Sequence, residues 1–511
     1  MMNAIELSLF SSRIAAICDE MGAVLQRSAF SPNIKDRLDF SCAVFDVDGE
    51  LCAQAAHIPV HLGSMAYAMK YIVSEVDWAP GDMLILNDPY LGGTHLPDVT
   101  MIAPVFVDSD LKAFVANRAH HADIGAATPG SMPISHTLDQ EGLLIPPSLL
   151  IRHGKLDELL MQSFMDAVSS PVQSNGDFTA QISANQLGVQ RLQALIQLTV
   201  GETFDTALIE LNDYAERLAN STLITIPRGE YCFTDVMDDD GMGNENIPIT
   251  VKLIVDEKNI VVDFAGTAEQ VNGNINCSLS VAAAAVYYVF RCLMPSQTPA
   301  CAGSFRRLKI QAPEGCLLNA RRPAAVAAGN VETSTRVVDV VMGALTKAIP
   351  EKMAAASQGS MNNVAMGGRG AKSWDYYETI GGGSGGHRLG NGLSAIQTHM
   401  TNTLNTPIES LESHYPLRIT RYGIRNDSAG QGEHRGGEGI IREYEFLSPA
   451  KVTLLTERRT VSPWGLLGGE PGGAGQNLLN GKQLPPKVSL QVKPGDRLTI
   501  MTPGGGGYGS A

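Results

Sequence analysis

Residues 82–121 read DMLILNDPYLGGTHLPDVTMIAPVFVDSDLKAFVANRAHH, with three apolar runs separated by short polar segments. The runs MLIL, MIAPVFV and KAFVANRAH are short and rich in strand-forming residues, so we expect three buried strands. His95 follows the first run after a Gly-Gly turn, and His120 and His121 end the third run. The stretch predicts an α/β or α+β fold with histidines at strand ends, where such folds usually place their chemistry.

The rest of the chain alternates helical and strand patterns. Apolar residues recur at helical spacing over residues 3–28, which predicts an amphipathic helix. A strand hairpin is expected around the Asp48-Gly49 turn. The same patterns predict helices at 64–76, 155–220, 278–294 and 325–360, and strands at 228–268 and in most of the chain beyond 400.

A chain of 511 residues is too long for one hydrophobic core, so a multi-domain protein is expected. We predict an N-terminal mixed α/β region with the site (1–220), a middle mixed α/β region (221–370) and a β-rich, glycine-rich C-terminal region (371–511). The final stretch, VKPGDRLTIMTPGGGGYGSA (492–511), predicts a last strand followed either by a flexible tail or by a segment that closes over a site.

Composition excludes several classes of protein. A net charge of −15 argues against nucleic-acid binding, which needs clustered Lys and Arg. The sequence contains no apolar run long enough for a transmembrane helix, and its start lacks the basic region of a signal peptide. None of the eight cysteines forms a CxxC pair, so reduced thiols are expected rather than a zinc–thiolate site. We therefore expect a cytoplasmic protein without membrane or nucleic-acid partners.

The histidines in the opening stretch are candidate metal ligands. His95 and Asp98 are three residues apart, and Pro97 stiffens the turn between them, so both side chains could converge on one ion. His120 and His121 point to opposite faces in any extended segment, so at most one of them should ligate directly. Histidines that only hydrogen-bond at loop ends are the alternative, and spacing alone leaves both interpretations open.

Other candidate sites carry weaker signals. His57 and His61 are four residues apart, but Pro59 between them argues against a helix, and the pattern alone favours a structural or supporting role. The glycine-rich segments 378–386 and 502–509 lack the Walker pattern and are not predicted to link a strand to a helix. We therefore predict no nucleotide site in this chain.

Ordered motifs over nearly the whole chain resemble the hydantoinase B/oxoprolinase family. They include DRLDFSCAVFD, HIPVHLGSM, NDPYLGGTHLPDVTMIAPVF, NRAHHADIG, TLDQEGLLIPP, DFTAQISANQLGVQRL, AAGNVETSTRVVDVV, THMTNTLNTPIESLESHYPLRITRY and LLTERRTVSPWGLLGGEPG. That family includes the B subunits of ATP-dependent N-methylhydantoinase and caprolactamase, the C-terminal half of 5-oxoprolinase, and the corresponding subunits of acetone and acetophenone carboxylases.

The resemblance implies a partner and a division of labour. A hydantoinase A-type subunit would bind ATP and phosphorylate a carbonyl oxygen or bicarbonate, and the B-type subunit would carry a divalent metal (Zn, Mn or Fe). The assembly would be a hetero-oligomer such as a dimer of heterodimers. The resemblance also implies the metal ligands His95, Asp98 and His120, with His121 in reserve and Asp39 as the fourth candidate.

The chemistry that the resemblance implies is ring opening of a cyclic amide such as a hydantoin, oxoproline or lactam. Phosphorylation of the carbonyl oxygen creates a leaving group, and a metal can polarise the adduct or activate water. Asp123 or His121 could accept a proton, and His57 and His61 are candidates to line the pocket. The alternative functions are the equivalent part of a ketone carboxylase and a non-catalytic scaffold for the A-type partner.

Overall fold

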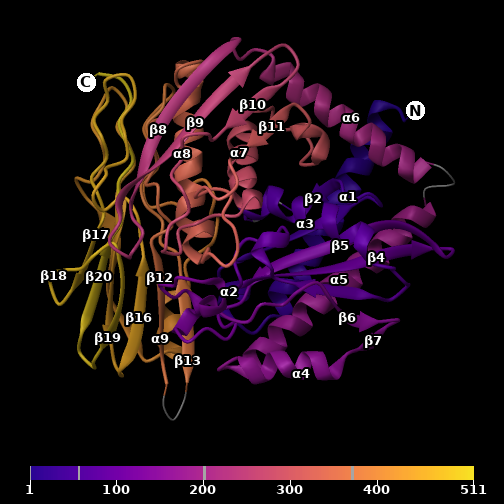
Figure 1. The fold of residues 1–511 in the computed structure, drawn as a ribbon, viewed down its shortest axis with the longest axis horizontal. Helices are drawn as coiled ribbons and strands as arrows, with labels where there is room; N and C mark the ends of the chain where they lie inside the picture. The colour runs from indigo at the N-terminus through magenta and orange to yellow at the C-terminus, as the bar shows by residue number, and fades with distance from the viewer. Residues whose placement is uncertain (1, 56–57, 199–202, 370–372, 511) are drawn as a thin grey trace.

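The computed structural model describes residues 2–55, 58–198, 203–369 and 373–510 (Figure 1). It begins with the predicted amphipathic helix, α1 (Ala4–Ser28). The side chain of Asn3 accepts hydrogen bonds from the first turn, and Glu6 bonds back to the Asn3 amide, which forms a capping box. The buried stripe of α1, which includes Phe10, Ile14 and Met21, packs against α5 (Pro171–Leu198) and the first strands.

A seven-stranded sheet forms the centre of the N-terminal region. Its order is β2-β1-β5-β4-β3-β6-β7, and all neighbouring strands are antiparallel. The strands are β1 (Phe40–Phe45), β2 (Leu51–Gln54), β3 (Met83–Leu86), β4 (Asp98–Val107), β5 (Asp110–His120), β6 (Ser148–Arg152) and β7 (Lys155–Leu156). The three strands predicted from the opening stretch are therefore present as β3, β4 and β5.

Helices cover both faces of this sheet. Val44 and Val115 belong to the core that α1 and α5 cover, whereas Phe45 and Phe114 belong to the core under α3 (His61–Glu75). Alternate residues of each strand therefore face different helices. The remaining helices of this region are α2 (Pro32–Lys35), α4 (Glu158–Ala167) and α6 (Thr203–Leu223).

The middle region combines one small sheet with two buried helices. The sheet has the order β11-β10-β9-β8, and only the β10–β11 pair in it is parallel. Its elements are β8 (Gly229–Asp239), β9 (Glu245–Val255), β10 (Ile260–Asp263), β11 (Leu308–Gln311), α7 (Leu279–Leu293) and α8 (Ser334–Leu345). Helix α7 packs against α3 of the first region, and α8 packs on β8 and β9.

The C-terminal region contains two antiparallel sheets, drawn at the left of Figure 1. Their orders are β13-β12-β16-β19 and β14-β15-β20-β17-β18. The elements are β12 (Asn363–Gly368), β13 (Trp374–Glu378), α9 (Ile408–His414), β14 (Leu417–Arg425), β15 (Gly439–Phe446), β16 (Ala450–Leu455), β17 (Gln476–Leu479), β18 (Lys482–Gln483), β19 (Lys487–Val492) and β20 (Arg497–Met501). Strand β12, from the end of the predicted middle region, pairs with strands of the predicted last region.

The glycine tail lies inside the protein. Residues 504–508 are buried, the amide of Gly505 donates to the carbonyl oxygen of Gly437 (2.9 Å), and that of Gly506 donates to Ala356 (2.8 Å). A Cβ atom on Gly505 would lie 1.9 Å from the carbonyl oxygen of Ser384, so only glycine permits this close contact between backbones. The expectation of a flexible tail is therefore wrong for these residues.

The three predicted regions share a hydrophobic core. One cluster of buried residues includes Val60 from the first region, Val331 from the middle and Tyr377 from the last. The fold confirms the expected mixture of helices and sheets, with mostly antiparallel strands. All eight cysteines are free, and none of the described helices is long and apolar enough to cross a membrane.

Candidate metal centre

His95, Asp98 and His120 come together at one edge of the seven-stranded sheet. One ligand atom from each lies within 4.8 Å of the other two, and all three side chains are buried. Asp98 begins β4 and His120 ends β5, and their Cα atoms are partners in the strand register. His95 comes from the turn before β4, which is closed by a hydrogen bond from the Asp98 amide to the His95 carbonyl (3.1 Å).

The facing atoms of this cluster have no hydrogen-bond partner. Nε2 of His95, Oδ1 of Asp98 and Nε2 of His120 are all buried and make no hydrogen bond, although the first two lie within ion-pair distance of each other (3.4 Å). Buried polar atoms without partners are costly, so three that converge need an additional group. Two imidazole nitrogens and one carboxylate oxygen are a ligand set that suits Zn²⁺, Mn²⁺ or Fe²⁺. The residues therefore fit a divalent metal ion.

Asp98 is held so that one carboxylate oxygen stays free. Its Oδ2 atom accepts hydrogen bonds from Thr94 Oγ1 (2.5 Å), His61 Nε2 (3.3 Å) and Asn330 Nδ2 (3.3 Å). Its Oδ1 atom faces His95 Nε2 at 3.4 Å. Donors on one oxygen only orient the carboxylate, which directs Oδ1 toward the two histidines.

The two histidines differ in their supporting contacts. Nδ1 of His95 lies 3.3 Å from the carbonyl oxygen of Ala327, which accepts a hydrogen bond from the Nδ1–H group, and in the neutral ring this leaves a lone pair on Nε2. Nδ1 of His120 lies 3.0 Å from Nδ2 of Asn33. Ligation through Nε2 of His120 needs a proton on Nδ1, so the Asn33 amide would turn its oxygen toward the ring. That oxygen now accepts a hydrogen bond from Arg37 Nη1 (3.3 Å), which the turn would break. The His120 ring also stacks on Tyr377, with ring centres 4.6 Å apart.

Electrostatics favour the metal-binding protonation states of Asp98 and His120. Burial lowers the pKa of His95, but Asp98 outweighs it and raises this pKa, so metal binding at Nε2 would release a proton from that ring. Burial and the nearby His95 hold the pKa of His120 well below its usual value, which keeps the imidazole neutral. Burial alone would raise the pKa of Asp98, but His95 and His61 outweigh it and hold the pKa of this carboxyl well below its usual range. A neutral histidine and an ionised aspartate are the forms that ligate metals.

A small cavity of about 20 Å³ adjoins the cluster. Its size admits about one water molecule. All three predicted regions contribute to its lining, which consists of Asp39, Ile58, Val60, His61, Asp98, His120, Asn330, Val331, Met361, Tyr377, Thr379, Met400, Thr401 and Thr403. Sites at junctions between regions are common for small-molecule chemistry.

Asp39 lies at this cavity but outside the group of three ligand residues. Its Oδ2 atom is 3.8 Å from Nη2 of Arg37, and its carbonyl oxygen accepts a hydrogen bond from the His120 amide (3.0 Å). Burial raises the pKa of Asp39, and Arg37 opposes this shift. The structure thus places the fourth predicted ligand beside the cluster, paired with an arginine.

His121 and Asp123 lie away from the cluster. Nε2 of His121 donates to Gln181 Oε1 of α5 (2.9 Å), and its ring contacts Phe178. The carboxylate of Asp123 accepts hydrogen bonds from the amides of Gly125, Ser169 and Ser170, so it orders the loop before α5. The structure does not bring these two predicted catalytic residues to the metal ligands. His121 contacts α5, and Asp123 contacts the loop that precedes α5, whereas the cavity lies beside the start of α3.

Of the two remaining candidates, His57 and His61, the structure describes only His61. His57 lies outside the described residues. His61 begins α3, lines the cavity and bridges Ser41 Oγ (3.0 Å to Nδ1) and Asp98. Its predicted place in the pocket therefore has a geometric basis.

Sequence reasoning missed Asn330 and Asn33, which hold the side chains of Asp98 and His120. Asn330 lies in the segment AAGNVETSTRVVDVV, whose only signal in the sequence is its match to a family motif, and it is 232 residues from Asp98 in the chain. No short-range spacing connects two positions so far apart, so the family motif was the one signal that could have found it.

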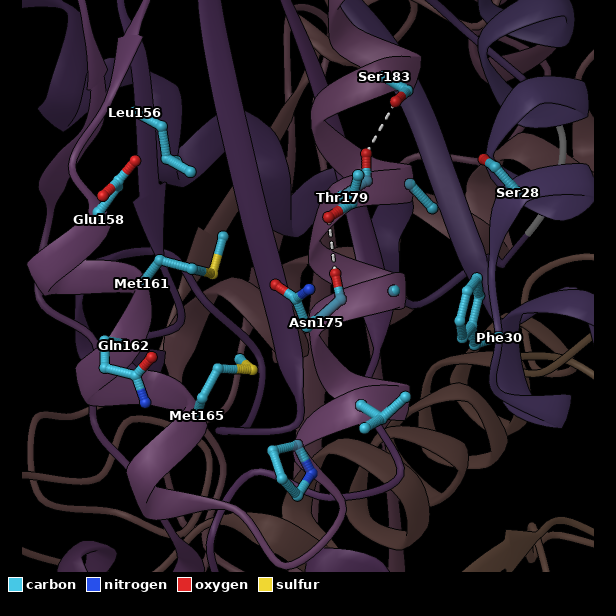
Figure 2. Close-up of a pocket in the computed structure, with 14 residues that line it drawn as sticks. Ser28, Phe30, Leu156, Glu158, Met161, Gln162, Met165, Asn175, Thr179 and Ser183 are labelled. Carbon is cyan, nitrogen blue, oxygen red and sulfur yellow. Dashed lines mark hydrogen bonds between the residues drawn. The ribbon is translucent and has the colours of Figure 1, made fainter.

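A much larger pocket lies elsewhere and contains none of the cluster residues. Figure 2 shows this groove of about 790 Å³ between α4 and α5, with Phe30 at one side and Met161 and Met165 at the other. Its lining is mostly apolar, and Glu158 is its one ionisable side chain. Its size alone therefore gives no reason to place the chemistry there.

Comparisons with known proteins agree with the motifs. A family model described as hydantoinase B/oxoprolinase matches residues 3–511. An uncharacterized protein of Methanocaldococcus jannaschii is 42% identical over all of this chain and 91% of its own length. A protein named 5-oxoprolinase 1 from Arabidopsis thaliana is 38% identical over 99% of this chain, which spans only 42% of that protein. The putative B subunit of a D-/L-hydantoinase from a Pseudomonas species is 33% identical over 96% of this chain and 87% of its own length.

Two solved structures share the fold. The ATP-dependent caprolactamase of Pseudomonas jessenii superposes with a TM-score of 0.93 and 28% identity, over 100% of this chain and 92% of that one. A nucleotide-free structure of acetone carboxylase gives a TM-score of 0.88 at 17% identity, over 99% of this chain and 76% of that one. The second likeness shows the fold alone.

Proposed function

Because the chain belongs to the hydantoinase B/oxoprolinase family, we propose that it is the metal-containing B-type subunit of a two-component, ATP-dependent cyclic amide hydrolase. The observation that carries this proposal is the convergence of three unpaired, buried ligand atoms from His95, Asp98 and His120. A structural role for the histidines would leave these atoms with hydrogen-bond partners.

The lengths of the relatives support a separate partner chain. This chain matches most of a protein named as the B component of a hydantoinase, but only about two fifths of the Arabidopsis 5-oxoprolinase. We propose that the remaining part of the longer relative corresponds to an A-type partner of this chain. We propose that this A-type chain binds ATP and phosphorylates the amide carbonyl oxygen, in a hetero-oligomer such as a dimer of heterodimers.

The net reaction opens the ring of a hydantoin, oxoproline or lactam. Two water molecules are consumed: one adds to the carbonyl carbon as the carbon–nitrogen bond breaks, and the other balances the release of phosphate from ATP. The ring nitrogen leaves with a proton, as an amine from oxoproline or a lactam and as a ureido N–H from a hydantoin. ATP is converted to ADP and phosphate, and this conversion drives the step. A divalent ion held by His95, Asp98 and His120 would supply Lewis acidity toward the carbonyl.

The residues of this chain prepare the site for that chemistry. Asp98 presents one fixed oxygen, since three donors hold the other. Ala327 fixes the tautomer of His95. His61 is the described candidate for holding a proton at the cavity wall, because its Nε2 atom donates a hydrogen bond to Asp98. His57, which lies outside the described residues, stays a candidate to line the pocket.

The direct test is activity of the complex with an A-type partner. Ring opening coupled to ATP hydrolysis should be detectable with hydantoins, 5-oxoproline or lactams, and His95→Ala should abolish it. The equivalent part of a ketone carboxylase is the second candidate, supported by the shared fold with acetone carboxylase. Turnover of a ketone that requires bicarbonate would overturn the hydrolase proposal. If the complex with His95→Ala were fully active, the metal-dependent mechanism would be wrong. A non-catalytic scaffold for the A-type chain would then remain as the function of this chain.

A further inference from the structure

We propose that Asn330 is a fourth ligand of the metal centre and binds the ion through its side-chain oxygen, Oδ1. The inference rests on the proposed function only in requiring that a divalent ion occupies the centre. Asn330 comes from the middle region, whereas the other three ligands come from the first. The ion would therefore join two regions of the chain.

The unpaired atoms of the cavity lead to this assignment. Among the side chains that line it, all of them described, three buried polar atoms have no hydrogen-bond partner: Asp98 Oδ1, His120 Nε2 and Asn330 Oδ1. Two of these atoms belong to the proposed ligands. The third is a carboxamide oxygen, which is a neutral ligand for divalent cations such as Mn²⁺.

The contact with Asp98 fixes which atom of the Asn330 amide is free. Its Nδ2 atom donates to Oδ2 of Asp98 at 3.3 Å. If the amide were turned by 180°, its oxygen would face a carboxylate oxygen and neither atom could donate a proton. The nitrogen therefore belongs on Asp98, and the oxygen remains as the unpaired atom of the amide.

The backbone at Asn330 is specialised for this placement. Asn330 lies in a π-helical turn, Gly329–Thr333, directly before α8. Such turns are rare and often occur at functional sites, because the wider turn changes the direction of a side chain. A Cβ atom on Gly329 would lie 1.8 Å from the carbonyl oxygen of Asn276, so glycine is required where the turn begins. The turn is thus held against a neighbouring segment.

The test is a titration of metal-free, full-length protein with Mn²⁺, with free Mn²⁺ measured by electron paramagnetic resonance. Asn330→Leu keeps a similar volume without the oxygen, and we expect it to weaken Mn²⁺ binding by at least about 10-fold. Asn330→Asp keeps an oxygen at this position but cannot donate to Asp98, and we expect it to bind Mn²⁺ within about threefold of wild type or more tightly, since an anionic oxygen is the stronger ligand.

Two variants complete the test. Asn185→Leu is the matched control, because Asn185 is fully buried on α5 and does not line the cavity; it should bind Mn²⁺ like wild type. If Asn330→Leu fails to fold by circular dichroism, Asn330→Ser removes the carboxamide at lower steric cost and should show the same weakened binding.

Two outcomes would overturn the inference. Unchanged Mn²⁺ affinity in the folded Leu or Ser variant would show that the oxygen does not ligate. Equal weakening in the Asp and Leu variants would show that Asn330 only positions Asp98 through its nitrogen. Wild-type protein that takes up no Mn²⁺, Zn²⁺ or Fe²⁺ would instead overturn the metal centre as a whole.

Discussion

Asp98 and His120 are Cα partners in the register of β4 and β5. Both side chains line the same cavity as His61, the first residue of α3. Side chains alternate between the faces of a sheet, so a slip of one residue would turn His121 toward the cavity in place of His120. The strand register therefore decides which histidine of the pair can reach the metal.

This relationship predicts opposite effects for two neighbouring substitutions. His120→Phe should abolish metal binding, whereas His121→Phe should retain the metal and lose about 1–3 kcal/mol of folding free energy, because Gln181 Oε1 loses its donor. Atomic emission measures the metal content, and urea unfolding measures the folding free energy. Loss of metal only in the His121 variant would reverse the assignment.

The contact between Asn33 and His120 predicts an effect on metal affinity. Asn33→Leu removes the partner of His120 Nδ1, so affinity should fall by roughly 10–100-fold. Asn33→Asp should preserve or strengthen binding, since a carboxylate accepts the Nδ1 proton without turning. Competition with a chelator gives both affinities, and equal values for Asn33→Leu and wild type would show that the contact has no role in ligation.

His399 predicts part of the pH dependence of stability. Burial lowers its pKa to about 4, below an unfolded value of about 6.5. The unfolded chain then binds a proton between these values that the folded protein does not. The contribution of His399 is therefore complete above pH 6.5 and declines by roughly 3 kcal/mol as the pH falls to about 4.

His399→Asn should reduce this decline. Asparagine tolerates the positive φ of 58° at this position better than most residues other than glycine do. Unfolding free energies at pH 7 and pH 4.5 measure the difference, and the loss between them should be smaller in the variant. An identical loss in both proteins would assign the decline to other groups.

The buried tail predicts a large effect of one methyl group. Gly505→Ala would place Cβ 1.9 Å from the Ser384 carbonyl oxygen, so we expect loss of at least about 3 kcal/mol or failure to fold. Gly423→Ala is the matched control, because no atom lies within 4 Å of its Cβ position; it should change stability by less than about 0.5 kcal/mol. Thermal unfolding compares the two, and similar melting temperatures would contradict the tight backbone packing.

The sequence predicted elements and ligand types better than their long-range arrangement. Strand patterns indicated β3, β4 and β5, and the alternation of side chains indicated that His120 and His121 point apart. Which of them faces the site depends on the helices above and below the sheet, and no local pattern specifies that choice. Asn330 was missed for the same reason, since its contact with Asp98 spans 232 positions.

The glycine tail shows a second limit of sequence reasoning. Periodicity arguments depend on side chains that alternate between core and solvent. The tail packs backbone against backbone, so it carries no such signal, and its glycines are typical of both flexible linkers and close contacts. Only the positions of Gly437 and Ser384 distinguish these two cases.

The most direct test of the central claim is the metal content of the purified full-length protein and of His95→Ala/Asp98→Ala. We expect close to one divalent ion per wild-type chain and almost none in the double variant, with both proteins folded by circular dichroism. A double variant that retains a full equivalent of metal, or a metal-free wild type that is fully active with its A-type partner, would contradict that claim.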